Sequence, residues 1–125
     1  KNPVYYLQYA HARISNLIVR YDNEIKEKTN LDMSLLNEKD EVSLIKKLSA
    51  FPTKMNELHQ SLEPRKLATY LEEVAAAYHK FYGNHKVINL DNIPLSYARK
   101  NLCNATQIIL KTGLSILGIT APKKM

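Results

Sequence analysis

The clearest helical pattern in this sequence lies in residues 63–84, EPRKLATYLEEVAAAYHKFYGN. Its apolar residues recur three or four positions apart, at Leu67, Ala68, Leu71, Val74, Ala75, Tyr78 and Phe81 or Tyr82. This spacing places them on one face of an α-helix, the face that packs against other helices. Pro64 suits the first turn, where no backbone N–H is needed, and Gly83-Asn84 is expected to end the helix with glycine in a left-handed cap. Residues 63–84 therefore predict a strong central helix.

The residues before this segment predict three further helices. Asn2-Pro3 is typical of a helix start, and apolar residues then follow at helical spacing to about Lys28. After a connection at residues 29–37, Asn37 is expected to cap a second helix that ends at Phe51-Pro52. The same Pro52 can open a short third helix, whose apolar face would be Met55, Leu58 and Leu62.

The residues after the central segment predict a loop at 84–94 and one more long helix. This helix is expected to begin at Pro94 or Leu95 and to end at Gly118, with a short tail to Met125. No run of residues alternates between apolar and polar as a strand does. The sequence therefore predicts an all-α bundle of about five helices, in one domain that spans residues 1–125.

The charge and the cysteine content narrow the choice of partner and compartment. Eighteen Lys and Arg against twelve Asp and Glu give a net charge of +6, which favours nucleic acid, an anionic membrane surface or an acidic protein. No apolar stretch is long enough to span a membrane, and no secretory signal is visible. Cys103 is the one cysteine and can form no intrachain disulfide, which suits the reducing cytoplasm.

The residue patterns of common catalytic centres are missing from the sequence. There is no glycine-rich phosphate loop and no cluster of cysteines. His79 and His85 lie six positions apart across an expected helix end, which is poor spacing for metal ligands. Glu72 and Glu73 are adjacent, so they point to different sides of a helix. We therefore expect no catalytic residue, no metal site and no cofactor in this chain.

The first helix carries a stripe of aromatic and basic residues away from its apolar face. At about 100° per residue, Tyr6, Tyr9, Arg13 and Arg20 lie together, roughly 120° from the side of Leu7 and Ile14. Tyrosine rings stack on unpaired bases, and arginine both stacks and pairs with phosphate. Nucleic-acid binding is one interpretation. The other is that Tyr6 and Tyr9 pack against another helix and that Arg13 is a solvated charge.

Two further positions have both a structural and a functional interpretation. Tyr82, beside Gly83, can cover the edge of the core or can offer its ring at a helix terminus. The end of the chain, Lys123-Lys124-Met125, is either a frayed terminus or a basic tail with a functional methionine.

Three stretches of the sequence together resemble one protein family. Residues 2–13, NPVYYLQYAHAR, resemble the segment that opens the C-terminal domain of arginyl-tRNA synthetases. Residues 63–71, EPRKLATYL, and the pair Phe81-Tyr82 are similar to the central helix of that domain. Residues 113–125, GLSILGITAPKKM, resemble the family's C-terminus, including its final Met. The resemblance covers essentially the whole chain.

This resemblance implies a DALR-type anticodon-binding domain, a helical bundle that holds the anticodon stem-loop of arginine tRNA. Tyr6, Tyr9 and Arg13 would then face the anticodon loop. Tyr82 and Met125 would close on splayed anticodon bases from the other side. The same residues stand out in the helical pattern and at the terminus, which favours the nucleic-acid interpretation.

The motif that names the domain is only half kept in this sequence. The matching residues are Ser96-Tyr97-Ala98-Arg99, in which the Ala-Arg half remains. No role is therefore assigned to Arg99.

The resemblance also implies a longer parent enzyme. The chain begins at Lys1 rather than at a Met, which predicts a fragment whose catalytic domain lies upstream. That domain would use ATP and Mg to join arginine to tRNA, and it would be a partner of this chain together with arginine tRNA. No membrane partner is expected.

A different class of function uses the same residues. A helical adaptor could grip a protein partner through the stripe of Tyr6, Tyr9 and Arg13. RNA binding should weaken steeply with salt because counterions are released, whereas a tyrosine-centred protein interface should be less sensitive. Salt dependence therefore separates the two hypotheses.

Overall fold

The computed structural model describes residues 3–61 and 63–125, and every regular element within them is helical. The α-helices are α1 (Pro3–Glu24), α2 (Lys39–Ser49), α3 (Phe51–Ser61), α4 (Pro64–Asn84) and α5 (Ile93–Ile116). A turn of 3-10 helix, η1 (Met33–Leu35), lies between α1 and α2. The predicted all-α bundle of about five helices is confirmed.

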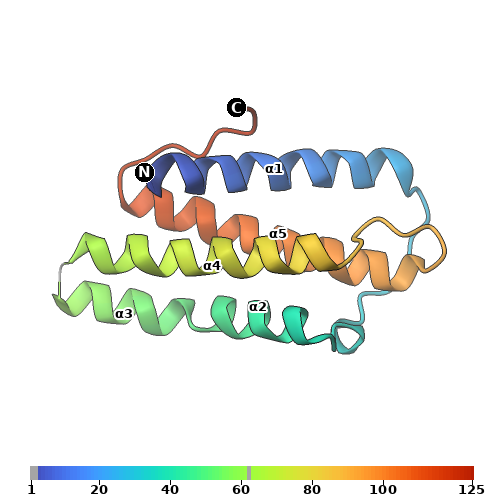
Figure 1. Cartoon of the computed structure of the whole chain (residues 1–125), viewed down its shortest axis with the longest axis horizontal. Coiled ribbons are helices and arrows are strands. Elements are labelled where there is room, and N and C mark those ends of the chain that lie inside the picture. Colours follow the sequence, from blue (N-terminus) through green and yellow to red (C-terminus); the bar gives the residue numbers. More distant parts are fainter. Residues whose placement is uncertain (1–2, 62) are drawn as a thin grey trace.

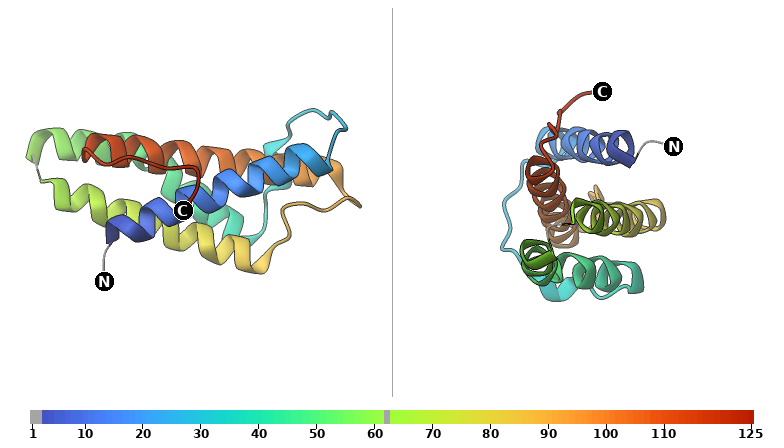
Figure 2. Two further views of the ribbon diagram at one scale, coloured as in Figure 1. Left: turned by 90° about the horizontal axis from the view of Figure 1, so that it is seen from above. Right: turned by 90° about the vertical axis from the view of Figure 1, so that its left-hand side faces the viewer.

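Helix α4 is the central element of the bundle, because it contacts each of the other four α-helices. Helices α1 and α4 run in the same direction, and α2 and α3 lie end to end along α4 (Figure 1). Seen end-on, α4 lies between α1 on one side and the pair α2 and α3 on the other (Figure 2). Helix α5 packs on both α1 and α4 and closes the core. The segment with the clearest sequence pattern thus organises the bundle.

Helices α4 and α5 approach each other closely at Gly113. Leu71 of α4 is fully buried, and Gly113 of α5 lies directly against it. A Cβ atom added at Gly113 would lie 2.6 Å from the Leu71 Cδ1 atom, well inside van der Waals contact. The missing side chain therefore sets how closely the two helices pack.

The first helix is shorter than its apolar spacing predicts. It begins at Pro3, as expected, but ends at Glu24 rather than near Lys28. Ile25 is still buried, so contact with the core continues past the last helical residue. The apolar spacing therefore continues past the end of the helix, because Ile25 packs in the core although it is not helical. The expected cap Asn2 lies outside the described residues.

The prediction that Asn37 caps α2 is wrong by one residue. The N-cap is Glu38, whose backbone N–H donates a hydrogen bond to the Glu41 Oε1 atom at 3.0 Å. A glutamate three residues into a helix can reach back to the cap in this way and satisfy a donor that the helix leaves unpaired. The helix therefore begins at Lys39.

The two glycines expected to end helices behave differently. Helix α4 ends at Asn84, within the predicted Gly83-Asn84, but Gly83 is still helical rather than in a left-handed cap, and His85 follows in an extended conformation with φ −137°. Gly118 has a φ of 77°, the left-handed region that favours glycine, and the chain leaves α5 there as predicted. Helix α5 starts at Ile93, earlier than expected, because the Asn92 side chain caps it by accepting the backbone N–H of Leu95 at 3.2 Å.

The segment Ser96–Arg99 near the start of α5 has a structural role. Ser96 is buried, and its Oγ atom accepts the N–H of Asn89 at 2.8 Å and donates to the Asn89 carbonyl at 2.9 Å. Arg99 is buried as well and forms an ion pair with Glu41 of α2. The segment therefore holds the loop before α5 and the start of α2 in place.

Candidate nucleic-acid interface

The groove where α1 packs on α4 holds one cation between two tyrosine rings. The Arg13 Nη1 atom donates a hydrogen bond to the Tyr9 Oη atom at 3.3 Å. The guanidinium carbon of Arg13 lies 5.6 Å from the centroid of the Tyr9 ring and 5.9 Å from that of Tyr82. Tyr9 and Arg13 come from α1 and Tyr82 from α4. We call these residues the Tyr9–Arg13–Tyr82 cluster.

The Tyr82 ring of this cluster rests on a rigid support. It stacks on the ring of Tyr78, with centroids 5.9 Å apart and ring planes inclined by 24°. Tyr78 is buried, and this burial raises the pKa of its hydroxyl far above the usual value. Tyr82 is itself half-buried, so it both covers the edge of the core and presents part of its ring to the groove. The two interpretations of Tyr82 are compatible.

The Tyr9 ring is extended on its other side by Tyr5. Their centroids lie 6.3 Å apart, with ring planes inclined by 13°. Tyr5 is 56% exposed and Tyr9 is 39% exposed, so both rings are accessible to a flat partner. The sequence interpretation missed Tyr5. The signal was present, because Tyr5, Tyr9 and Arg13 follow one another at four-residue intervals, the spacing of side-chain neighbours on a helix.

A hollow of about 490 Å³ opens between α1 and α4 next to the cluster. Arg13, Arg20 and Tyr82 are among the residues that line it, so the structure places Arg20 in the predicted site. Arg20 also faces Glu24 at 3.8 Å, with both side chains at least half exposed. An exposed pair of this kind is weak and does not commit the Arg20 guanidinium to Glu24.

Tyr6 also lies between α1 and α4, but it lines a separate hollow with Pro3, Glu72 and Ala76. Its ring is half-buried, 5.6 Å from the His79 ring of α4. Burial, and to a smaller extent Glu72, raises the pKa of Tyr6. Tyr6 thus packs against another helix, beside the cluster rather than within it. Its predicted contact with RNA stays a prediction.

The charge in the groove comes from arginine and not from histidine. The hydrogen bond with Tyr9 is the main cause that raises the pKa of Arg13, so this residue stays positive at any physiological pH. Burial, followed by the nearby charge of Arg13, lowers the pKa of His79. At neutral pH the groove therefore presents guanidinium groups and aromatic faces beside a neutral imidazole.

The C-terminal tail folds back onto α1. The Gln8 Nε2 atom donates to the Thr120 carbonyl at 2.9 Å, and the His11 Nδ1 atom to the Pro122 carbonyl at 3.0 Å. Figures 1 and 2 show the tail running along α1, with the C-terminus over the middle of this helix. Met125 is 54% exposed there. Among the described contacts none joins Met125 to the Tyr9–Arg13–Tyr82 cluster, so its predicted role stays a prediction.

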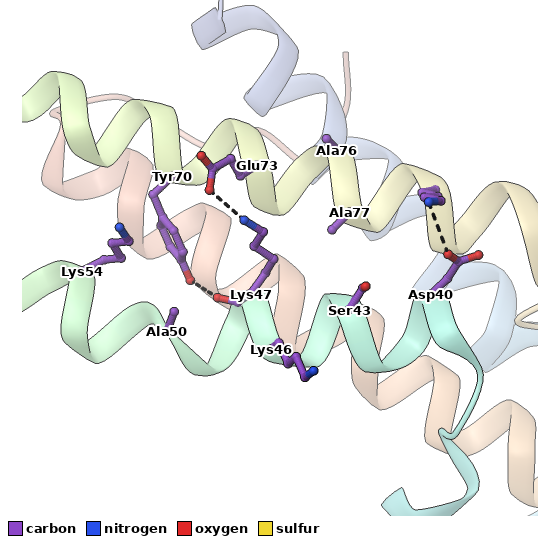
Figure 3. A pocket seen from close by; sticks show the side chains of 11 residues that line it. Asp40, Ser43, Lys46, Lys47, Ala50, Lys54, Tyr70, Glu73, Ala76 and Ala77 are labelled. Atoms are coloured by element: carbon purple, nitrogen blue, oxygen red, sulfur yellow. Dashed lines mark hydrogen bonds and ion pairs between the residues drawn. The ribbon is translucent and has the colours of Figure 1, made fainter.

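A wider hollow of about 690 Å³ lies between α2 and α4 (Figure 3). Two of its lysines form ion pairs with carboxylates across the two helices: Lys47 Nζ is 2.9 Å from Glu73 Oε1, and Lys80 Nζ is 4.0 Å from Asp40 Oδ1. The buried Tyr70 hydroxyl donates to the Lys47 carbonyl at 2.5 Å. These bonds join α2 to α4, and they leave this hollow less suited to a polyanion than the groove between α1 and α4.

Clusters of metal ligands and membrane-spanning helices are both absent from the residues that the structure describes. No group of three or more His, Cys, Asp or Glu there could hold a metal ion. No helix in residues 3–61 and 63–125 combines the length and apolar character needed to cross a bilayer.

The sequence and the fold are both similar to those of arginyl-tRNA synthetases. In alignments of 125 positions that cover 99% of the chain, it is 42% identical to an arginine–tRNA ligase of Listeria welshimeri and 40% identical to one of Thermotoga maritima. The structure matches Thermus thermophilus arginyl-tRNA synthetase with a TM-score of 0.82, at 29% identity over 96% of the chain. The chain covers 22%, 23% and 21% of these three proteins, about one fifth of their length.

One family model covers nearly the whole chain. The model described as the DALR anticodon binding domain matches residues 7–125. The match includes Tyr9, Arg13, Tyr82 and Met125, and it confirms the resemblance that the sequence motifs indicated. The chain belongs to the family of DALR anticodon binding domains.

Proposed function

We propose that this chain binds the anticodon stem-loop of arginine tRNA as one domain of a longer arginine–tRNA ligase. Its family and the names of its relatives support this proposal. The observation that carries it is the position of the Arg13 guanidinium between the rings of Tyr9 and Tyr82, in an open groove of a chain with net charge +6.

The chemistry of this groove fits an RNA loop better than a regular duplex. Bases in an anticodon loop can be splayed out, and an aromatic ring can then stack on each exposed face. Tyr9, extended by Tyr5, offers one such surface, and Tyr82 on its Tyr78 support offers another. Arg13 and Arg20 supply charges for the phosphates that join these bases. Met125 would close on the bases from the tail.

The chain would contribute binding energy and orientation but no chemistry. In the longer enzyme, a catalytic domain would use ATP and Mg to activate arginine, and the anticodon contacts would position the tRNA for transfer. The chain alone is expected to form no arginyl adenylate. Arginine-dependent exchange of pyrophosphate into ATP by residues 1–125 would contradict this expectation.

We further propose a cytoplasmic location, where the tRNA partner and a reducing environment are both available. Cys103 is buried, and burial raises the pKa of its thiol to about 12, so it is protonated and unreactive at neutral pH. A chain with one inert thiol has no need of an oxidising compartment.

The experiment that tests the proposal is a titration of the chain with an anticodon stem-loop of arginine tRNA at several salt concentrations. Affinity should fall as salt rises, because each arginine that contacts a phosphate releases counterions. The variant Arg13→Gln should bind more weakly and lower the salt slope by about one. Arg65→Gln is the matched control, since Arg65 is exposed at the opposite end of α4 from Tyr82.

Two results would overturn the proposal. One is equal affinity for the anticodon stem-loop and for an unrelated RNA duplex. The other is binding that does not depend on salt, which would favour the alternative of a helical adaptor for a protein partner.

A further inference from the structure

The C-terminal tail is held on α1 by two side chains whose partners are more than one hundred residues away in sequence. The Gln8 amide donates to the Thr120 carbonyl and the His11 ring donates to the Pro122 carbonyl, at separations of 112 and 111 residues. Both acceptors are backbone carbonyls, so they would be present whatever side chains the tail carried, provided that its backbone followed the same path. The specificity of the contact lies in the two donors on α1.

The course of the tail presents these carbonyls to α1. Gly118, with φ 77°, turns the chain away from α5, and Ile119 N–H bonds back to the Leu114 carbonyl at 2.8 Å. Ile119 and Ala121 then pack against the core, while the residues between and after them, Thr120 and Pro122, supply the bonded carbonyls. In an extended segment successive residues face opposite sides, so every second side chain packs on the core when one side of the segment lies against it.

The donors lie on a different flank of α1 from the proposed RNA groove. At about 100° per residue, Gln8 and His11 lie within about 60° of each other and far around the helix from Tyr9 and Arg13. Between these two flanks, Ala12 points away from the core, yet only 3% of its surface is exposed. Its low exposure agrees with a tail that crosses this outer side of α1.

The His11 contact is an internal one and not a surface contact. His11 is 3% exposed, and burial is the main cause that lowers its pKa. The hydrogen bond with Pro122 acts in the opposite direction, and Lys111 and Lys123 lower the pKa further, so the net direction is down. The imidazole is therefore neutral at neutral pH. A carbonyl only accepts, so the proton of the neutral ring is on Nδ1, where it donates to Pro122.

We propose that Gln8 and His11 are positioning residues that hold the tail on α1 and thereby determine where Met125 lies. Met125 follows Pro122 by only three residues, so the His11 bond limits how far its side chain can move. In RNA binding the two residues act through the tail and do not touch the RNA. This last step rests on the proposed function, whereas the anchoring of the tail does not.

The mobility of Met125 tests the anchor without any RNA. The chain has three methionines, so isotope labelling of their methyl groups gives one NMR signal each for Met33, Met55 and Met125. In the double variant Gln8→Leu/His11→Leu, the Met125 signal should sharpen and move to the position of an unstructured chain. The Met33 and Met55 signals should not change, which shows that the fold is intact.

Two less disruptive variants test whether the effect on Met125 comes from loss of the hydrogen bonds or from a change in the fold. His11→Asn keeps an N–H donor close to the place of Nδ1 and should restore the restricted Met125 signal. Gln8→Leu alone changes a half-buried residue and should loosen the tail in part. An equally restricted Met125 methyl in the wild type, the double variant and Gln8→Leu would overturn the proposal.

The second measurement asks whether the anchor acts through Met125. Loss of one base contact should weaken binding of the anticodon stem-loop by about fivefold or more, both in Gln8→Leu/His11→Leu and in a chain without Met125. Combining the two changes should weaken binding no further, since both remove the same contact. Losses that multiply would show that His11 and Gln8 act by another route. A wild-type chain that binds no RNA would remove the proposed function, while the methyl signals would still decide the anchor.

Discussion

Arg99 of α5 and Glu41 of α2 form an ion pair inside the bundle, with the Arg99 Nε atom 2.6 Å from Glu41 Oε2 across 58 residues of sequence. Glu41 is 0% exposed and Arg99 is 7% exposed. Each of the two residues makes one further hydrogen bond, because Arg99 Nη1 donates to the Lys86 carbonyl at 3.0 Å and Glu41 Oε1 accepts from Glu38 N. Arg99, to which the half-kept motif assigned no role, therefore joins three segments of the chain.

Arg99→Met should destabilise the chain strongly, because it leaves the Glu41 carboxylate buried without its partner. Breaking one side of a buried pair costs about 3–5 kcal/mol. Urea unfolding followed by circular dichroism measures the difference. The double variant Glu41→Leu/Arg99→Met, which removes both charges, should recover much of the loss. A single variant as stable as the wild type would show that the pair is dispensable.

Gly113→Ala and Gly83→Ala should change stability in opposite directions. The new methyl at Gly113 would lie 2.6 Å from the Leu71 side chain, and overpacking of this kind costs about 1–3 kcal/mol. At Gly83, the last residue but one of α4, nothing lies within 4 Å of a Cβ, and alanine in a helix is more stable than glycine by up to about 1 kcal/mol. Thermal unfolding of the two variants beside the wild type checks both signs. A stable Gly113→Ala would mean that α5 can shift to make room.

Tyr9→Ala should weaken binding of the anticodon stem-loop while the fold is retained. Tyr9 is 39% exposed and stacks on Tyr5, so its loss removes a surface ring and not a core one. One lost base stack costs about 1–3 kcal/mol. The matched control is Ile108→Ala, an exposed apolar residue on α5, which should leave affinity unchanged. A collapsed helical signal for Tyr9→Ala would instead make this residue part of the core.

Removal of Met125 should lower charging of tRNA by the longer enzyme with little effect on stability. The side chain is 54% exposed, so it contributes little to the core. Its flexible thioether suits packing on an aromatic ring or on a base face. Steady-state charging with and without Met125, beside a melting curve for each protein, measures both effects. Unchanged charging would remove the proposed role, and a large fall in melting temperature would make Met125 a structural residue.

The sequence by itself determined the helices and the local part of the candidate site. The apolar spacing in residues 63–84 depends on helix geometry alone, and it marked α4 correctly. Tyr9 and Arg13 are neighbours for the same reason, since they lie four residues apart on α1. Gly118 could be identified because few other residues tolerate a positive φ. Each of these features depends on residues within one or two helical turns.

The ends of the helices were less predictable from the sequence. They depend on side-chain caps and on burial, and the periodicity of apolar residues does not report either. Glu38 rather than Asn37 caps α2, since Glu41 can reach back to its backbone. Buried Ile25 continued the pattern of α1 after the helix had ended.

Only the tertiary structure decided which distant residues meet. Tyr82 reaches Arg13 because α4 packs on α1, and His11 bonds Pro122 because Gly118 sends the tail back over that helix. Arg99 finds Glu41 for a similar reason, across the contact of α5 with α2. Helical periodicity shows which face of a helix is apolar, but not which other helix will cover that face. That choice comes from packing all five helices at once around a common core.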